Sequence, residues 1–300
     1  MAMVQLKPNF FVVGAAKAGT TSLFSYISQH PDVFAPVRKE MKYFSFMENF
    51  NGPGDKEIER TLIRSYEEYL EYYRAEKEYG AVGDVSPDYL YHSGETIKNI
   101  LEKIGRKAKI IIILRNPSDR AYSFYRHMLL KGHEKLSFQE ALAAEEEREK
   151  QGWRWSWLYR KSSFYFDAVS AYLSSFDEVL ILRYEELKEN PLGMMKKVYR
   201  FLGVDEEFKP EVEKIHNESP KNRFMINLTA SNSGMKRMLR KLMNPTRRRK
   251  IKEQLVSISN KIFPTENHDG EVRHILAKEY VEDVQKLERL LGVSLEEWKH

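Results

Sequence analysis

Residues 10–23 decide the fold of this chain, and they read Phe10-Phe11-Val12-Val13-Gly14-Ala15-Ala16-Lys17-Ala18-Gly19-Thr20-Thr21-Ser22-Leu23. The apolar start predicts a buried strand, and the residues after Gly19 predict an amphipathic helix. Small residues between them let backbone N–H groups approach an anion, and the helix start adds unpaired N–H groups and a positive dipole end. The stretch therefore predicts a phosphate-binding turn.

This turn differs from the loop that binds nucleoside triphosphates, which reads Gly-x-x-x-x-Gly-Lys-[Ser/Thr]. Gly14 and Gly19 keep that spacing, but Thr20 stands where the lysine belongs and Lys17 lies inside the turn. A nucleotide kinase or ATPase is therefore disfavoured and stays as an alternative interpretation.

Further apolar runs predict more strands at 109–114 and 179–182, with a weaker one at 81–83. None of them alternates with polar residues, which is typical of strands buried on both faces of a parallel sheet. The helical stretches that alternate with them cover 21–29, 56–74, 95–104, 119–131, 138–150, 165–175 and 192–202. The alternation predicts a three-layer α/β fold with a central, mainly parallel sheet flanked by helices.

The organisation of the chain predicts a single domain over residues 1–300, because no repeat or low-complexity linker divides it. We expect a sheet core over about 9–205 and a helical C-terminal part over about 206–300. Helical segments near 233–262 and 272–291 should pack on the sheet or cover the site.

The composition is that of a globular protein, with 42% apolar residues and a formal charge of +5. This charge suits an anionic ligand and is too small to predict a nucleic-acid partner. The absence of cysteine excludes disulfides, thiolate metal sites and a cysteine nucleophile. No stretch approaches the roughly 20 apolar residues of a membrane span, and the N-terminus lacks a signal sequence, so we expect a soluble, cytoplasmic protein.

A second anion-binding stretch lies at 110–125. There a strand ends at Arg115, Pro117 starts a helix, and Ser123 follows two turns later. Ligands of open α/β sheets bind at the carboxyl ends of strands, and a guanidinium with a hydroxyl suits a second phosphate. Surface salt bridges of Arg115 and Arg120 are the alternative explanation.

These two stretches resemble the phosphate-binding motifs of sulfotransferases that use 3′-phosphoadenosine-5′-phosphosulfate (PAPS). In that family a Lys-x-Gly-Thr-[Thr/Ser] loop holds the phosphosulfate, and a Leu-Arg-[Asn/Asp]-Pro stretch followed by Arg-Ala-x-Ser holds the 3′-phosphate. Other stretches that resemble the family are 83–90, 182–187, 190–191, 201–203 and 290–298. The resemblance implies a P-loop-type fold and transfer of a sulfuryl group from PAPS, which leaves 3′-phosphoadenosine-5′-phosphate (PAP).

The resemblance also implies the donor contacts. They are Lys17, Ala18, Gly19, Thr20, Thr21, Ser22, Arg115, Ser123, Tyr165 and Arg223. Tyr165 stands where relatives have a Gly-x-Tyr element beside the nucleotide. Lys17 would neutralise the charge that develops on the leaving phosphate. No metal ion is expected, because a sulfuryl group carries less negative charge than a γ-phosphoryl group.

For the general base we favour Glu40, since residues 38–44 resemble the Glu-x-x-Phe-Phe element of heparan-type and related bacterial sulfotransferases. A solvated glutamate flanked by Lys39 and Lys42 is the alternative. The branch of the family that acts on small molecules uses a histidine, so His92 and His127 are further candidates, and His127 lies one turn after Ser123.

The acceptor cannot be specified from the sequence. Heparan-type relatives often carry a lysine where this chain has Val85, so either Lys39 or Lys42 replaces that contact or the contact is absent. We expect a hydroxyl acceptor, less readily an amine, on a small molecule, a glycan or a lipid. The oligomeric state is left open.

The segment 236–252 is strongly basic, and its apolar residues fall near helical spacing. It could lie on an anionic membrane surface or guide an acidic acceptor, or form a solvated helical face. A noncatalytic protein that binds polyanions or membranes through this segment is the third functional hypothesis.

Overall fold

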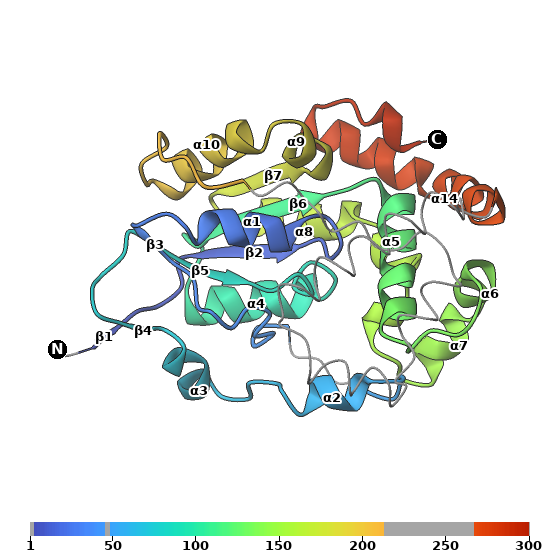
Figure 1. Cartoon of the computed structure of the whole chain (residues 1–300), viewed down its shortest axis with the longest axis horizontal. Coiled ribbons are helices and arrows are strands. Elements are labelled where there is room, and N and C mark those ends of the chain that lie inside the picture. The colour runs from blue at the N-terminus through green and yellow to red at the C-terminus, as the bar shows by residue number, and fades with distance from the viewer. Residues whose placement is uncertain (1–2, 46–48, 213–266, 300) are drawn as a thin grey trace, which may run out of the picture.

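The computed structural model describes residues 3–45, 49–212 and 267–299 (Figure 1). Its centre is a five-stranded sheet in the order β3-β5-β2-β6-β7, in which all neighbouring strands are parallel. The strands are β2 (Phe10–Gly14), β3 (Val33–Phe34), β5 (Ala81–Val85), β6 (Lys109–Leu114) and β7 (Val179–Arg183). Helices flank this sheet, so the predicted α/β fold is confirmed.

The middle strands form the core. Every residue of β2 is buried, and the four isoleucines of β6 are fully buried beside it. β-branched residues pack well on a pleated surface that is covered on both faces. Because β2 and β6 are adjacent and parallel, the turns that follow Gly14 and Leu114 meet at one edge of the sheet.

Most of the predicted helices are present with small changes at their ends. They are α1 (Thr20–Ile27), α4 (Ser93–Lys103), α5 (Pro117–Leu130), α8 (Phe166–Ser175), α10 (Pro191–Leu202) and α14 (Asn267–Leu291). Helix α1 contacts α10, and α4 contacts α8. The predicted helix at 233–262 lies outside the described residues.

Two of the predicted helices are wrong as single elements. The stretch 56–74 forms two short helices, α2 (Asp55–Glu59) and α3 (Tyr66–Glu71), because the side chain of Ser65 accepts from the N–H of Glu68 and starts a new helix. The stretch 138–150 divides at Ala144 into α6 (Phe138–Ala143) and α7 (Glu145–Lys150).

The sequence did not predict every element of the structure. The additional strands are β3 and an antiparallel pair, β1 (Val4–Gln5) with β4 (Arg74–Ala75), and an additional short helix, α9 (Tyr184–Glu189), follows β7.

The C-terminal helix α14 packs against α5, as Figure 1 shows. Arg273 of α14 forms an ion pair with Asp119 of α5 and lies over the ring of Tyr122. Helix α14 also contacts α8 and α6, so these contacts place it on helices that flank the sheet. No helix in the described part of the chain is long and apolar enough to cross a membrane.

Candidate active site

The turn between β2 and α1 is shaped by close packing. Gly19 has a φ of 94°, and a Cβ there would lie 2.8 Å from Cδ2 of Leu187 and 2.9 Å from Cδ2 of Tyr184. Glycine is therefore required both for the backbone conformation and for the approach of α9. The N–H of Ala15 donates to the carbonyl of Ile113 at 2.6 Å, which fixes the turn to β6.

Lys17 lies in this turn and meets the second predicted anion-binding residue. Nη1 of Arg115 donates to the carbonyl of Lys17 at 3.3 Å, across 98 positions of sequence. Burial, and after it the positive charge of Arg115, lowers the pKa of Lys17 to about 8. The structure thus brings the two predicted donor-binding motifs into contact.

Arg115 is held from several sides. Its guanidinium carbon lies 4.8 Å from the centre of the Tyr184 ring, and Nη2 lies 3.7 Å from Oδ2 of Asp119. Tyr165 is buried, and its hydroxyl donates to the carbonyl of Arg115 at 2.9 Å. In this structure Tyr165 positions Arg115, and its contact with a nucleotide stays a prediction.

Helix α5 begins as the sequence predicted. The side chain of Asn116 accepts from the N–H groups of Ser118 and Asp119, and Pro117 occupies the first turn. Ser123 and His127 are four residues apart, so they share one face of the helix. Lys131, four residues further on, caps the helix through its own N–H to the carbonyl of His127.

The segment that carries Glu40 is fixed to the end of β5. The N–H of Glu40 donates to the carbonyl of Val85 at 2.9 Å, and the N–H of Lys42 donates to Oγ of Ser86 at 3.3 Å. Three non-glycine residues, Lys17, Glu40 and Lys42, have φ values of 71°, 57° and 59°. Such backbone strain concentrates at functional sites, and two of these three residues, Lys17 and Glu40, are predicted catalytic residues.

The carboxylate of Glu40 lies between two ammonium groups. Oε1 is 3.9 Å from Nζ of Lys39, and Oε2 is 3.5 Å from Nζ of Lys42. Burial by itself would raise the pKa of Glu40, but the positive charges of Lys42 and Lys39 outweigh it and hold the pKa below its ordinary value. The lowered pKa means that Glu40 is ionised at neutral pH. Because 43% of the side chain is exposed, a substrate can reach it.

His127 is near the same charges. Burial, then the positive charges of Lys17 and Lys131, lowers the pKa of His127 to about 3, against an opposing effect of Glu40. His127 is therefore neutral at pH 7, and because the pKa of Glu40 is lowered as well, basicity alone does not choose between the two candidates. His92 lies at the start of α4 next to Tyr91, and burial lowers its pKa.

The alternative explanation, in which Arg120 forms a surface salt bridge, is wrong because the side chain is buried. Its side chain is fully buried, with Nε donating to the carbonyl of Ala16 at 3.1 Å and Nη1 donating to Oγ of Ser162 at 3.0 Å and of Ser163 at 2.5 Å. Arg120 therefore stabilises the phosphate-binding turn through its hydrogen bond to the carbonyl of Ala16.

Asp84 is a second supporting residue that the sequence did not single out. Its buried carboxylate accepts from the hydroxyls of Tyr69 (2.9 Å), Tyr89 (2.8 Å) and Ser86 (2.8 Å). Burial raises its pKa to about 6, although these hydrogen bonds oppose the shift. Asp84 thus orders the end of β5 that holds the Glu40 segment.

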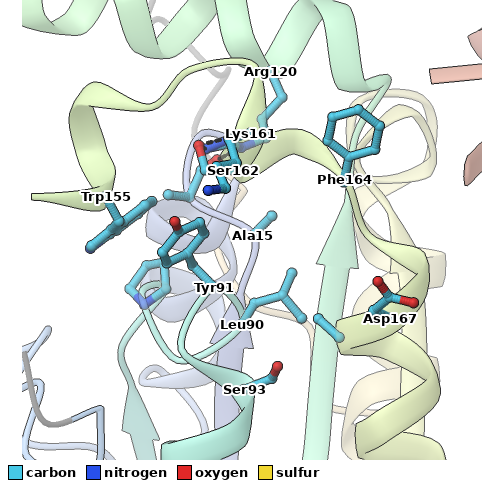
Figure 2. Close-up of a pocket in the computed structure, with 13 residues that line it drawn as sticks. Ala15, Leu90, Tyr91, Ser93, Arg120, Trp155, Lys161, Ser162, Phe164 and Asp167 are labelled. Carbon is cyan, nitrogen blue, oxygen red and sulfur yellow. Dashed lines mark hydrogen bonds between the residues drawn. The ribbon is translucent and has the colours of Figure 1, made fainter. Parts of the chain in front are cut away.

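A cavity of about 220 Å³ lies next to Ala15 and Ala16 of the turn. Figure 2 shows Tyr91 and Trp155 along one side of it, Phe164 and Asp167 along the other, and Ala15 between them. Lys17, Glu40 and His127 do not line this cavity. Among the described residues, no three His, Asp or Glu side chains gather as they would around a metal ion.

The remaining predicted donor contacts fall into two groups. Ala18, Gly19, Thr20, Thr21 and Ser22 follow Lys17 in the turn and the first residues of α1. Arg223 and the basic segment 236–252 lie outside the described residues, and their roles stay predictions.

A family model described as a sulfotransferase domain matches residues 7–269 of the chain. A sulfotransferase from Alicyclobacillus acidocaldarius, known from its crystal structure, is 32% identical with a TM-score of 0.76, and the match covers 98% of this chain and 100% of that one.

Two curated relatives are also similar. The human bifunctional heparan sulfate N-deacetylase/N-sulfotransferase 3 is 28% identical over 211 residues, and the mouse N-deacetylase/N-sulfotransferase 4 is 27% identical over 219 residues. Each match covers 66% of this chain but only 22% of the relative. The chain therefore spans about a fifth of the length of these proteins.

Proposed function

Because this chain belongs to the sulfotransferase family and is an enzyme of that class, we propose that it transfers the sulfuryl group of PAPS to a hydroxyl acceptor, with Glu40 as general base and Lys17 at the leaving phosphate. An amine acceptor is the less favoured variant. The proposal treats residues 1–300 as one sulfotransferase domain.

The contact between Lys17 and Arg115 carries the proposal for the donor. The turn around Lys17 and the N-terminus of α1 suit the 5′-phosphosulfate, while Arg115 and Ser123 suit the 3′-phosphate. ATP lacks a 3′-phosphate, and the lysine of the nucleoside-triphosphate loop is replaced by Thr20. ATP therefore has no group for the proposed 3′-phosphate contacts, and the chain lacks the lysine with which nucleoside-triphosphate loops bind it.

The proposed reaction is an in-line displacement. The acceptor oxygen attacks sulfur, an S–O bond forms, and the bond from sulfur to the bridging phosphate oxygen breaks. Glu40 takes the proton of the acceptor hydroxyl. Lys17 stabilises the negative charge that develops on the leaving phosphate, and preorganised groups of this kind often make the largest catalytic contribution.

The proposal is tested with ³⁵S-labelled PAPS and a panel of phenol, glycan, lipid and amine acceptors. The names of the mammalian relatives specify N-sulfation of heparan sulfate, so a glycan with free amines belongs in this panel. Transfer of label by the wild type and its loss in Glu40→Gln support the proposal. Transfer of γ-³²P from ATP in its place would contradict it.

A further inference from the structure

The carboxylate of Asp84 accepts the protons of three hydroxyl groups. It is almost fully buried at the end of β5, where Oδ1 accepts from Ser86 at 2.8 Å and Oδ2 accepts from Tyr89 at 2.8 Å and from Tyr69 at 2.9 Å. An ionised carboxylate has no proton to donate, so each of these hydroxyls directs its single proton toward Asp84. The oxygens of the hydroxyls are then left as acceptors.

Two of these oxygens hold the segment that carries Glu40. The N–H of Lys42 donates to Oγ of Ser86 at 3.3 Å, and the N–H of Phe44 donates to the hydroxyl oxygen of Tyr89 at 3.3 Å. Both acceptor residues are fully buried, so bulk water does not compete for these contacts. The direction of the two hydroxyl protons therefore decides whether the backbone N–H groups find an acceptor.

The backbone of this segment needs such support. Glu40 and Lys42 have φ values of 57° and 59°, in the left-handed region that residues other than glycine rarely adopt. Residues in such conformations persist only where the surrounding contacts fix them. The N–H of Glu40 donates to the carbonyl of Val85, and the N–H of Lys42 donates to Ser86. Residues 84–86 thus hold both strained positions.

Asp84 itself is out of reach of the substrates, because only 1% of the residue is exposed. Burial raises its pKa to about 6, so the carboxylate is ionised at pH 7.5, at which the variants below are compared. We infer that Asp84 is a positioning residue for the proposed base: it directs the protons of two nearby hydroxyls so that the backbone around Glu40 keeps the geometry that proton transfer requires. This inference rests on the proposed function, because it takes Glu40 as the base.

The test is Asp84→Asn, which keeps the shape of the side chain and replaces one carboxylate oxygen by an NH₂ group. This group only donates, so the hydroxyl that faces it loses the acceptor of its proton, whichever way the amide is turned. The assay is transfer of ³⁵S from PAPS to the member of the acceptor panel that the wild type sulfates fastest. We expect kcat to fall about 10- to 100-fold, an effect typical of a slightly misplaced catalytic group, and the affinity for PAP to stay within about twofold.

A double-substitution cycle with Glu40→Gln separates positioning from a general structural defect. If Asp84 acts through Glu40, Asp84→Asn should lower turnover by less than about twofold in the Glu40→Gln background, because no base is left to position. A merely structural role predicts the same fold loss in both backgrounds. Should Asp84→Asn fail to fold, Ser86→Ala takes its place in the cycle.

The two hydroxyls provide a rescue and a control. Ser86→Ala and Tyr89→Phe each remove one of the two acceptors and should each lower kcat, whereas Ser86→Thr keeps the hydroxyl and should retain most of it. Tyr199→Phe is the matched control, because Tyr199 is fully buried and its hydroxyl donates to the carbonyl of Tyr26 at 2.9 Å, between α10 and α1. It loses one buried hydrogen bond and should keep the kcat of the wild type.

Amide hydrogen exchange tests the same contacts without an acceptor substrate. Exchange of the peptide 40–45 should be faster in Asp84→Asn than in the wild type, because the N–H groups of Lys42 and Phe44 lose well-oriented partners. It should be unchanged in Tyr199→Phe. The melting temperature of each variant shows that the protein is folded.

Two failures are distinguishable. If no acceptor of the panel receives label from the wild type, or if Glu40→Gln turns over as fast as the wild type, the proposed function fails. If Glu40→Gln loses turnover but Asp84→Asn keeps it, or lowers it equally in both backgrounds, the positioning role is overturned while the proposed base stands. Unchanged exchange of the peptide 40–45 in Asp84→Asn would also overturn it.

Discussion

Nζ of Lys39 donates a hydrogen bond to Oγ1 of Thr21 at 2.9 Å. This contact joins the segment that carries Glu40 to the first turn of α1, where we place the donor phosphate. Because the N–H of Glu40 is also bound to the carbonyl of Val85, the proposed base is fixed to both the sheet and the donor-binding turn. The structure thus couples the position of the proposed base to that of the proposed donor site.

Lys39→Met should move the acid limb of the pH profile of kcat/KM to higher pH. The positive charges of Lys42 and Lys39 lower the pKa of Glu40, and removal of one of them raises the pH at which Glu40 becomes protonated and inactive. The measurement is the profile from pH 4 to 7, with Lys150→Met as control. An acid limb that does not move, or moves to lower pH, would argue against Glu40 as the base.

The affinity for PAP should fall as the pH rises above about 8, the pKa of Lys17. Burial favours the neutral amine, so Lys17 is charged below this pH and loses its proton above it. A bound phosphate favours the charged form and raises the pKa of Lys17 in the complex, so the affinity falls from about pH 8 until the pH reaches that higher pKa. Titrations at pH 7 and pH 9 should differ for the wild type and agree for Lys17→Met, and an equal decline in that variant would assign the pH dependence to another group.

Glu40→Gln should retain PAP affinity and lose turnover by about 10² to 10⁴, the usual contribution of a general base. The amide keeps the shape of the side chain but cannot accept the proton. Calorimetry with PAP and single-turnover transfer from PAPS separate the two effects. Turnover close to that of the wild type would pass the role of base to another residue.

His127→Asn should retain turnover within about tenfold of the wild type, because we propose Glu40 as the base and because a histidine whose pKa is about 3 is neutral at pH 7 and adds no charge to the site. The pH profile between 5 and 7 should be unchanged by the substitution. A loss as large as that of Glu40→Gln, with PAP still bound, would make His127 the base.

The apolar runs of β2 and β6 predicted two strands of a parallel sheet, because a strand that is buried on both faces has apolar residues without polar alternation. The stretch 56–74 was wrongly predicted as one helix, since its composition does not reveal that a second helix begins after Ser65. The motifs identified Lys17 and Arg115, and the structure brings these two together.

Residues whose roles depend on distant partners could not be found in this way. Arg120 supports the turn through the carbonyl of Ala16, and Asp84 is defined by hydroxyls from α3 and from the residues after β5. The Arg-Ala-x-Ser and Gly-Asp-Val-Ser-Pro stretches around Arg120 and Asp84 were the available signals, and they indicate a motif without indicating which atoms meet.

The most direct test of the donor site is a calorimetric titration without Mg²⁺ that compares PAP with adenosine 5′-monophosphate, which lacks the 3′-phosphate. A charge-assisted contact to phosphate contributes about 1.5 to 3 kcal/mol, so PAP should bind the wild type at least about tenfold more tightly. Arg115→Met should remove most of this difference, and Lys17→Met should weaken both nucleotides. Equal affinity for the two nucleotides, or tighter binding of ATP with Mg²⁺ than of PAP, would contradict the account.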